Sequence, residues 1–153
     1  MRCWRLIKSD FVTKAFTGDG ARIAGGRWNP KGSSVVYTAS SLALAALEHL
    51  VHADDDLLPA DLVAFAVDIP EELSIEHVII DHLPLDWRSY PPPESLQDFG
   101  ASWLTQRLTA VLCVPSAVIP EEGNFLLNPL HPDFARIAWE DPHPFSLDSR
   151  LRR

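Results

Sequence analysis

The segment from Leu62 to Ile69 is apolar on both faces when it is read as a β-strand. Its two alternating sets are Val63, Phe65 and Val67 on one side, and Leu62, Ala64 and Ala66 on the other. A strand with two apolar faces lies inside a sheet and not at its edge. Because 153 residues suffice for one sizeable core and are too few for two, we expect one domain over residues 1–153.

Short runs of β-branched and aromatic residues, bracketed by turn residues, predict the remaining strands. These runs are Cys3–Lys8, Ser34–Thr38, Val78–Ile80, Val111–Val114, Asn124–Leu127 and Arg136–Trp139. The stretch between the first two strands, 18–32, is so rich in Gly, Asn and Pro that we expect a shaped loop there. The tail Ser149–Arg153 is basic, and we expect it to fray.

Two segments predict helices. One follows Ser40 or Ser41, either of which can cap it, and its buried stripe is expected to be Leu44, Leu47 and Val51. Asp54–Asp56 would end this helix in a solvated loop. The other begins at Glu94, and its apolar face is predicted to hold Leu96, Phe99, Trp103, Leu104 and Leu108. Since helices connect only some of the strands, the fold class is α/β (α+β), with a mixed, largely antiparallel sheet.

The charge balance excludes several classes of function. Thirteen Lys and Arg against 21 Asp and Glu give a net charge of −8, which repels a nucleic-acid backbone, so we expect no direct nucleic-acid partner. Apolar runs such as Leu42–Leu47 are far shorter than a bilayer span, and the N-terminus has no signal-peptide pattern. We therefore expect no membrane association and a cytoplasmic protein.

No motif indicates a metal site. Cys3 and Cys113 lack CxxC or CxxH spacing and lie in apolar strands, so we expect two buried thiols and no disulfide framework. His49 and His52 share a helix face, but no HExxH or other ligand spacing accompanies them.

Four polar residues stand where packing alone does not require them: Arg27, Tyr37, Glu48 and Ser116. On a helical wheel Glu48 borders the buried face, where its carboxylate can point into a cleft or be an ordinary boundary glutamate. Arg27 follows two glycines, so it can reach a phosphate or pair with a surface acid. Tyr37 can stack on a ligand ring or pack at a sheet edge. Ser116 lacks the GxSxG context of a hydrolase nucleophile.

An ordered set of motifs gives these residues a common context. The motifs are Gly25–Asn29, Tyr37–Ala39, Ala46–Glu48, Val114–Ala117, Asn124–Pro129 and His131–Phe134. Together they resemble the RES domain family, and the match covers nearly the whole chain. The resemblance implies a fold similar to ADP-ribosyltransferases, activity on NAD, and a role as the toxin of a bacterial toxin–antitoxin pair.

The resemblance also implies roles for individual residues. It places Arg27, Tyr37, Glu48 and Ser116 in a pocket for NAD, as catalytic and substrate-binding groups. Asn124 and Asn128 are further candidates for polar contacts with the substrate. NAD is then the substrate, and no cofactor or metal is implied.

Two alternatives to NAD cleavage with water or phosphate as acceptor stay open at this point. One transfers ADP-ribose to a protein, and the other is a non-catalytic module that binds a nucleotide or a partner. The partner that the resemblance implies is an Xre-type antitoxin with its own DNA-binding region, which would cover or enter the cleft. A homodimer within such a complex is also compatible with the family.

Overall fold

The computed structural model describes residues 1–53 and 60–151, and all of its strands join one sheet. The strands are β1 (Arg2–Lys8), β2 (Val36–Ala39), β3 (Leu62–Asp68), β4 (Ile75–His77), β5 (Val111–Pro115), β6 (Gly123–Leu127), β7 (Ala138–Trp139) and β8 (His143–Phe145). Their order is β4-β5-β6-β2-β1-β3-β7, and β8 also pairs with β3. The β4–β5 pair is parallel and the other pairs are antiparallel, which confirms the predicted mixed, largely antiparallel sheet.

Strand β3 is internal, as its two apolar faces predict. It pairs with β1 on one side and with β7 and β8 on the other. Phe65 and Val67 enter one apolar cluster with residues of β2, β5 and β6, whereas Leu62 and Ala64 enter a second cluster beneath α2. Burial on both sides therefore fixes this strand in the middle of the sheet.

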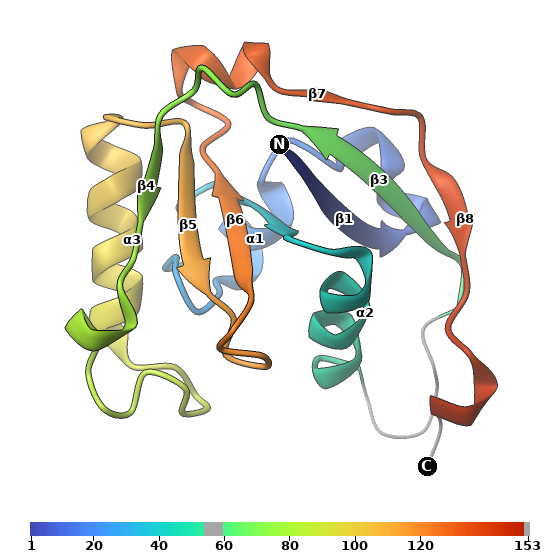
Figure 1. Cartoon of the computed structure of the whole chain (residues 1–153), viewed down its shortest axis with the longest axis horizontal. Helices are drawn as coiled ribbons and strands as arrows, with labels where there is room; N and C mark the ends of the chain where they lie inside the picture. The colour runs from blue at the N-terminus through green and yellow to red at the C-terminus, as the bar shows by residue number, and fades with distance from the viewer. Residues whose placement is uncertain (54–59, 152–153) are drawn as a thin grey trace.

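The helices are α1 (Asp19–Ala24), α2 (Leu42–Val51) and α3 (Glu94–Gln106), with short 3₁₀ turns at Ser9–Lys14, Ile80–His82, Pro132–Arg136 and Ser149–Leu151. Figure 1 shows α3 beside β4, β5 and β6, and α2 below the β1 side of the sheet. Leu96 and Trp103 of α3 pack with Leu112 and Leu126 of the sheet. Two helices thus cover different parts of one sheet.

Helix α2 corrects the predicted stripe. Leu44, Ala45 and Ala46 are its buried residues, while Leu47 is 37% and Val51 58% exposed. The buried residues lie in the first half of the helix, so Leu47 and Val51 meet solvent. Ser41 is the N-cap, since its side chain accepts a hydrogen bond from the Leu44 amide at 3.0 Å.

Several other predictions need correction. The expected loop 18–32 contains the short helix α1, which lies between Gly18 and Gly25, both with left-handed backbone, and includes the good helix formers Ala21, Arg22 and Ala24. The strand expected at 78–80 lies at Ile75–His77, where it pairs with β5.

Further corrections concern the second half of the chain. Residues 132–136 form a 3₁₀ turn, so β7 is shorter than the predicted strand. Phe99 is 40% exposed, and Leu108 lies beyond the end of α3 and is 73% exposed. Cys3 is buried, but Cys113 is partly exposed. The prediction for Asp54–Asp56 lies outside the described residues.

Candidate functional site

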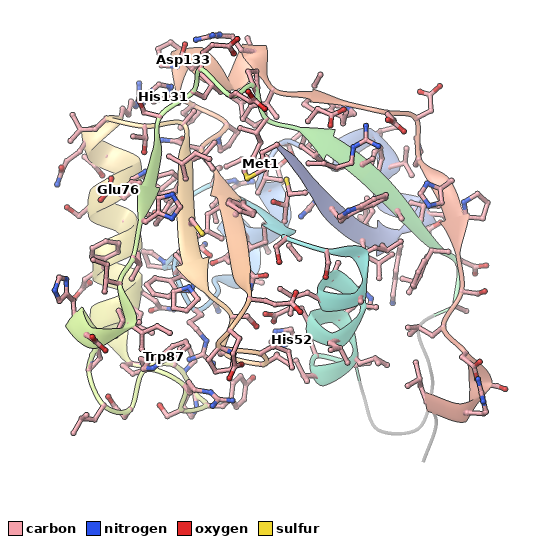
Figure 2. All side chains as sticks on the ribbon, viewed as in Figure 1. Met1, His52, Glu76, Trp87, His131 and Asp133 are labelled. Carbon is pink, nitrogen blue, oxygen red and sulfur yellow. The ribbon has the colours of Figure 1, made fainter. Side chains whose placement is uncertain are left out.

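A cleft of about 1010 Å³ lies between α2 and the segment that precedes α3. Its walls come from β1, the glycine-rich loop 24–28, β2, α2, residues 88–92 and the segments around 115–118 and 124. The polar and charged side chains on its walls are Arg5, Arg27, Tyr37, Thr38, Glu48, His49, His52, Arg88, Tyr90, Gln97 and Asn124. Figure 2 shows His52 and Trp87 on the same end of the molecule, with His131 and Asp133 at the opposite end.

The Glu48 carboxylate is held at one oxygen and open at the other. Its Oε1 accepts a hydrogen bond from the Ser116 hydroxyl at 2.7 Å and another from the Asn124 amide at 2.7 Å. No hydrogen bond reaches Oε2 from residues 1–53 or 60–151. Two donors on one oxygen fix the orientation of the carboxylate, so the second oxygen can serve a ligand in the cleft.

Ser116 is linked to the cleft by its hydrogen bond to Glu48. The residue is fully buried, and its Oγ accepts hydrogen bonds from the amides of Val118 and Ile119, both at 3.0 Å. Its hydroxyl proton is given to Glu48. Since its donor is in use and the residue does not line the cleft, the structure makes Ser116 a positioning residue for Glu48.

Asn124 contacts both Glu48 and the cleft. Its amide nitrogen donates to Glu48, whereas its Oδ1 is buried and has no hydrogen-bond partner in the described part of the chain. A buried acceptor without a donor is unfavourable by about 1–3 kcal/mol, so this oxygen is available to accept a hydrogen bond from a ligand.

Tyr37 lies on β2 and its hydroxyl is occupied by the glycine-rich loop. The hydroxyl donates to Asn29 Oδ1 at 2.7 Å and accepts from the Trp28 amide at 3.2 Å. Burial raises the pKa of the Tyr37 phenol well above its usual range. A Cβ on Gly26 would lie 2.7 Å from the Tyr37 hydroxyl oxygen, so only glycine allows this approach. The tyrosine therefore offers a ligand its ring and not its hydroxyl.

Arg27 connects the glycine-rich loop to the segment that precedes α3. Its Nη1 donates to the carbonyl oxygens of Trp87 at 2.6 Å and Ser89 at 3.0 Å. Burial lowers the pKa of Arg27, and the negative charge of Glu48 opposes that shift. Glu48 and Arg27, distant in sequence, are thus close enough in the same cleft to interact electrostatically.

Arg5 is a cleft residue that the sequence analysis missed. Its Nη1 donates to the Tyr37 carbonyl oxygen at 2.7 Å, and its Nε is buried without a partner in the described residues. Burial lowers the pKa of Arg5 to about 10, so the guanidinium stays charged at neutral pH. The sequence signal that could have identified it is an arginine between Trp4 and Leu6 inside an apolar strand, because a charged side chain is rarely buried without a partner.

Asn128 is not brought to the cleft. It is 1% exposed and follows the far end of β6, where its side chain donates to the Leu104 carbonyl and accepts from the Leu130 amide. It organises the turn toward His131, which Figure 2 shows far from His52 and Trp87. Of the six predicted site residues, four line the cleft, Ser116 supports it from behind, and Asn128 is elsewhere.

The cleft is rich in positive charge. Within residues 1–53 and 60–151, Glu48 is its one carboxylate, against Arg5, Arg27 and Arg88. None of these arginines belongs to an ion pair there, since the five pairs involve other residues on the surface. No group of three His, Cys, Asp or Glu side chains in that part of the chain could hold a metal ion. Such a site can bind an anion while presenting one carboxylate to a positive centre.

Comparisons with known proteins agree with the motifs. The model of the RES domain matches residues 2–148. A protein named Toxin Res from Photorhabdus laumondii is 41% identical over 99% of this chain and 97% of its own length. A protein named Prs ADP-ribosylating toxin from a Sphingobium species is 38% identical over 98% and 96%.

A solved structure shows the same fold at lower identity. A chain of the M. tuberculosis MbcT–MbcA toxin–antitoxin complex superposes with a TM-score of 0.76 at 17% identity, covering 95% of this chain and 84% of that one. Within the described residues no helix is both long and apolar enough to cross a bilayer. With a family model that spans nearly the whole chain and two relatives near 40% identity, this protein belongs to the RES domain family.

Proposed function

We propose that this protein is the toxin of a bacterial type II toxin–antitoxin pair and that it cleaves NAD⁺ at the bond between nicotinamide and ribose. The observation that carries the proposal is the open oxygen of Glu48 in a cleft whose other charged groups are arginines. The toxin names of its RES relatives support the biological role. Depletion of cellular NAD would then be the toxic effect.

The reaction needs one anionic group beside a developing cation. When the bond from ribose C1′ to the ring nitrogen breaks, the electron pair leaves with nicotinamide, which becomes neutral, and the ribose becomes oxocarbenium-like. A carboxylate beside C1′ stabilises that charge. Water or inorganic phosphate then attacks C1′ and gives ADP-ribose or its 1″-phosphate, with any proton released to solvent. NAD is the substrate, and the proposal requires no cofactor.

The other cleft residues fit the remaining parts of the dinucleotide. The arginine guanidinium groups suit the two negative charges of its pyrophosphate. The Tyr37 ring suits stacking near the nicotinamide, since its hydroxyl is already used by the loop. Asn124 Oδ1 can accept a hydrogen bond from the carboxamide N–H or from a ribose hydroxyl. Ser116 would act by holding Glu48 in place.

A second candidate keeps the chemistry and changes the acceptor. The name of the Sphingobium relative favours transfer of ADP-ribose to a protein. Both reactions would begin in the same way, because each requires the bond between nicotinamide and ribose C1′ to break before or as the acceptor attacks. The two reactions differ in the mass of the product that carries the ADP-ribose.

The partner we propose is an Xre-type antitoxin that covers or enters the cleft, in the cytoplasm. The net charge of −8 makes the toxin itself a poor ligand for DNA, so promoter binding would come from the partner. A co-purified complex should therefore turn over NAD far more slowly than the free toxin, and full turnover by the complex would contradict this proposal.

The first experiment is mass-resolved analysis of NAD incubated with the purified protein, with and without phosphate. Glu48→Gln keeps the size and the hydrogen bonds of the side chain while removing its charge, and nicotinamide release should fall by about 100-fold or more. Glu76→Gln is the matched control, because Glu76 lies on β4 away from the cleft (Figure 2). Its turnover should equal that of the wild type.

The products separate the candidates. Free ADP-ribose, its 1″-phosphate and a protein of increased mass identify water, phosphate and protein as the respective acceptors. If NAD survives intact with every acceptor and the folded protein still binds ADP-ribose, the protein is a binding module and the catalytic proposal is wrong.

A further inference from the structure

The segment Trp87–Pro92 forms one wall of the cleft and is attached to the site at three points. The Trp87 side chain is buried in the apolar cluster beneath α3. Arg27 Nη1 donates to the carbonyl oxygens of Trp87 and Ser89. From within the segment, Arg88 Nε donates to the Ala117 carbonyl at 2.9 Å. These attachments join the glycine-rich loop, this segment and the segment after β5 around the cleft.

The bond from Nε fixes the guanidinium of Arg88 and leaves its two terminal nitrogens open. Within residues 1–53 and 60–151 these nitrogens donate no hydrogen bond, and Arg88 makes no ion pair. Arg88 lines the cleft, as do its neighbours Tyr90 and Pro92. A guanidinium held at Nε presents its terminal amino groups as a planar pair, the geometry that binds phosphate oxygens.

Arg88 also lies close to Arg27. The positive charge of Arg88 contributes to lowering the pKa of Arg27, in addition to the larger effect of burial. Two guanidinium groups that repel each other, and that belong to no ion pair among the described residues, would be stabilised together by an anion that bridges them.

We propose that Arg88 is a substrate-binding residue for the pyrophosphate of the dinucleotide, and that Arg27 is the residue that holds the segment carrying Arg88 in place. The proposal rests on the proposed NAD substrate and specifies which groups bind its phosphates. Arg27 connects the two parts of the site, because its Nη1 holds the segment while its Nε and Nη2 donate no hydrogen bond within residues 1–53 and 60–151. The segment Trp87–Pro92 thereby determines whether a ligand with a pyrophosphate is preferred to one without.

The test combines steady-state kinetics with calorimetric binding of ADP-ribose. Arg88→Gln should raise KM for NAD and Kd for ADP-ribose by about 10-fold or more, the effect expected for a lost hydrogen bond to a charged group, while kcat changes less than about twofold. Arg88→Lys keeps the charge and should recover part of the loss. Arg136→Gln is the control, since Arg136 is an exposed arginine beside Asp133, which Figure 2 places at the opposite end of the molecule.

A double-mutant cycle tests the role of Arg27. In an Arg27→Gln background the segment is no longer held, so the additional effect of Arg88→Gln on Kd for ADP-ribose should be much smaller than in the wild type. Amide hydrogen exchange of residues 87–90 should accelerate more in Arg27→Gln, which loses the bonds to the Trp87 and Ser89 carbonyls, than in Arg88→Gln, which loses only the bond to the Ala117 carbonyl. Independent, additive effects with unchanged exchange would overturn the positioning role.

The outcomes separate this inference from the proposed function. If the wild type cleaves NAD and Arg88→Gln changes neither KM nor Kd, the inference is wrong and the function stands. If the wild type does not cleave NAD but binds ADP-ribose in a manner that depends on Arg88, the function is wrong and the inference stands. If the wild type neither cleaves NAD nor binds ADP-ribose, both are wrong.

Discussion

Glu48 is surrounded by groups that fix one of its oxygens and leave the other free. Ser116 and Asn124 come from two segments joined by the β5–β6 connection, and both donate to the same carboxylate oxygen. Because an oxygen with two donors is held in one orientation, the free oxygen has a defined direction before any ligand arrives. Preorganisation of this kind is what an electrostatic contribution to catalysis requires.

Replacing Ser116 with alanine tests the support of Glu48. The change leaves the amides of Val118 and Ile119 without an acceptor and removes one donor from Glu48, so the free energy of unfolding should fall by about 2 kcal/mol. The value of kcat for NAD should fall, but less than in Glu48→Gln, because the charge remains. Urea unfolding and initial rates measure both effects.

The control for this variant is Ser102→Ala on the exposed face of α3, where the serine hydroxyl only accepts from Gln106. Its stability should stay within about 0.5 kcal/mol of the wild type. A Ser116→Ala variant as stable and as active as this control would show that the hydrogen bond to Glu48 has no positioning role.

Replacing Asn124 with aspartate introduces a carboxyl where an amide now donates to Glu48 at 2.7 Å. Two carboxylates at that distance repel, so the introduced carboxyl should keep its proton well above the usual range for aspartate. The protonated form can still donate to Glu48. Stability and kcat/KM should therefore be best preserved at low pH and should fall as pH rises through this ionisation.

The measurement is kcat/KM and the unfolding free energy between about pH 5 and pH 8, the range in which the raised ionisation is expected. Asn124→Ala removes the donor without adding a charge, and it should show no added loss as pH rises. Parallel pH profiles for the two variants would contradict the contact between Asn124 and Glu48.

At the scale of the element, α3 depends on a close approach that a single methyl group would prevent. Gly100 packs against the backbone at Trp28, and a Cβ there would lie 1.7 Å from the Trp28 carbonyl oxygen. Trp28 belongs to the glycine-rich loop that also carries Arg27 and Asn29. The packing of α3 therefore fixes one wall of the cleft.

Two glycine-to-alanine changes in helices should have opposite effects. Gly100→Ala should destabilise the protein by about 3 kcal/mol or more, because the clash is with backbone that cannot move freely. Gly20→Ala in α1 meets nothing within 4 Å and should stabilise by about 0.5–1 kcal/mol through reduced backbone entropy of the unfolded chain. Thermal and urea unfolding measure the change in the free energy of unfolding of each variant. Equal changes in the two variants would contradict the packing of α3.

The sequence predicted where strands and helices lie better than it predicted which side chains of a helix are buried. The internal position of β3 followed from its apolar pattern alone, since a strand that is buried on both faces has apolar residues at successive positions. The stripe of α2 did not, because which turns of a helix meet the sheet depends on where that helix ends relative to the strands. Leu47 and Val51 continue the apolar spacing past the edge of the contact.

The candidate site shows the same limit. Arg27, Tyr37, Glu48 and Asn124 were identified from residue type, position and family resemblance, and the structure places them in one cleft. The indirect role of Ser116 and the remote position of Asn128 depend on hydrogen bonds across 68 and 24 residues, which no local pattern encodes. Arg5 was missed for a related reason, because its partners lie on another strand.

At the scale of the whole molecule, the charge of the cleft is opposite to that of the chain. The protein carries a net charge of −8, yet the described lining of the cleft holds three arginines and one glutamate. A small anion approaching from solvent therefore meets two fields of opposite sign. The distant acids act over tens of ångströms at low salt, whereas the arginines act at contact.

The dependence of KM on salt shows which field governs binding. The Debye length falls from about 17 Å at about 30 mM salt to less than 10 Å at about 300 mM, so distant repulsion fades over this range while contacts with the arginines must compete with chloride. If the arginines bind the pyrophosphate, KM for NAD rises several-fold over this range and kcat is unchanged. If the net charge of −8 governs the encounter, KM falls as salt screens the repulsion. Arg88→Gln should flatten the rise and Arg136→Gln should keep it, so a slope that is the same in all three proteins would exclude a charge contact between Arg88 and the substrate.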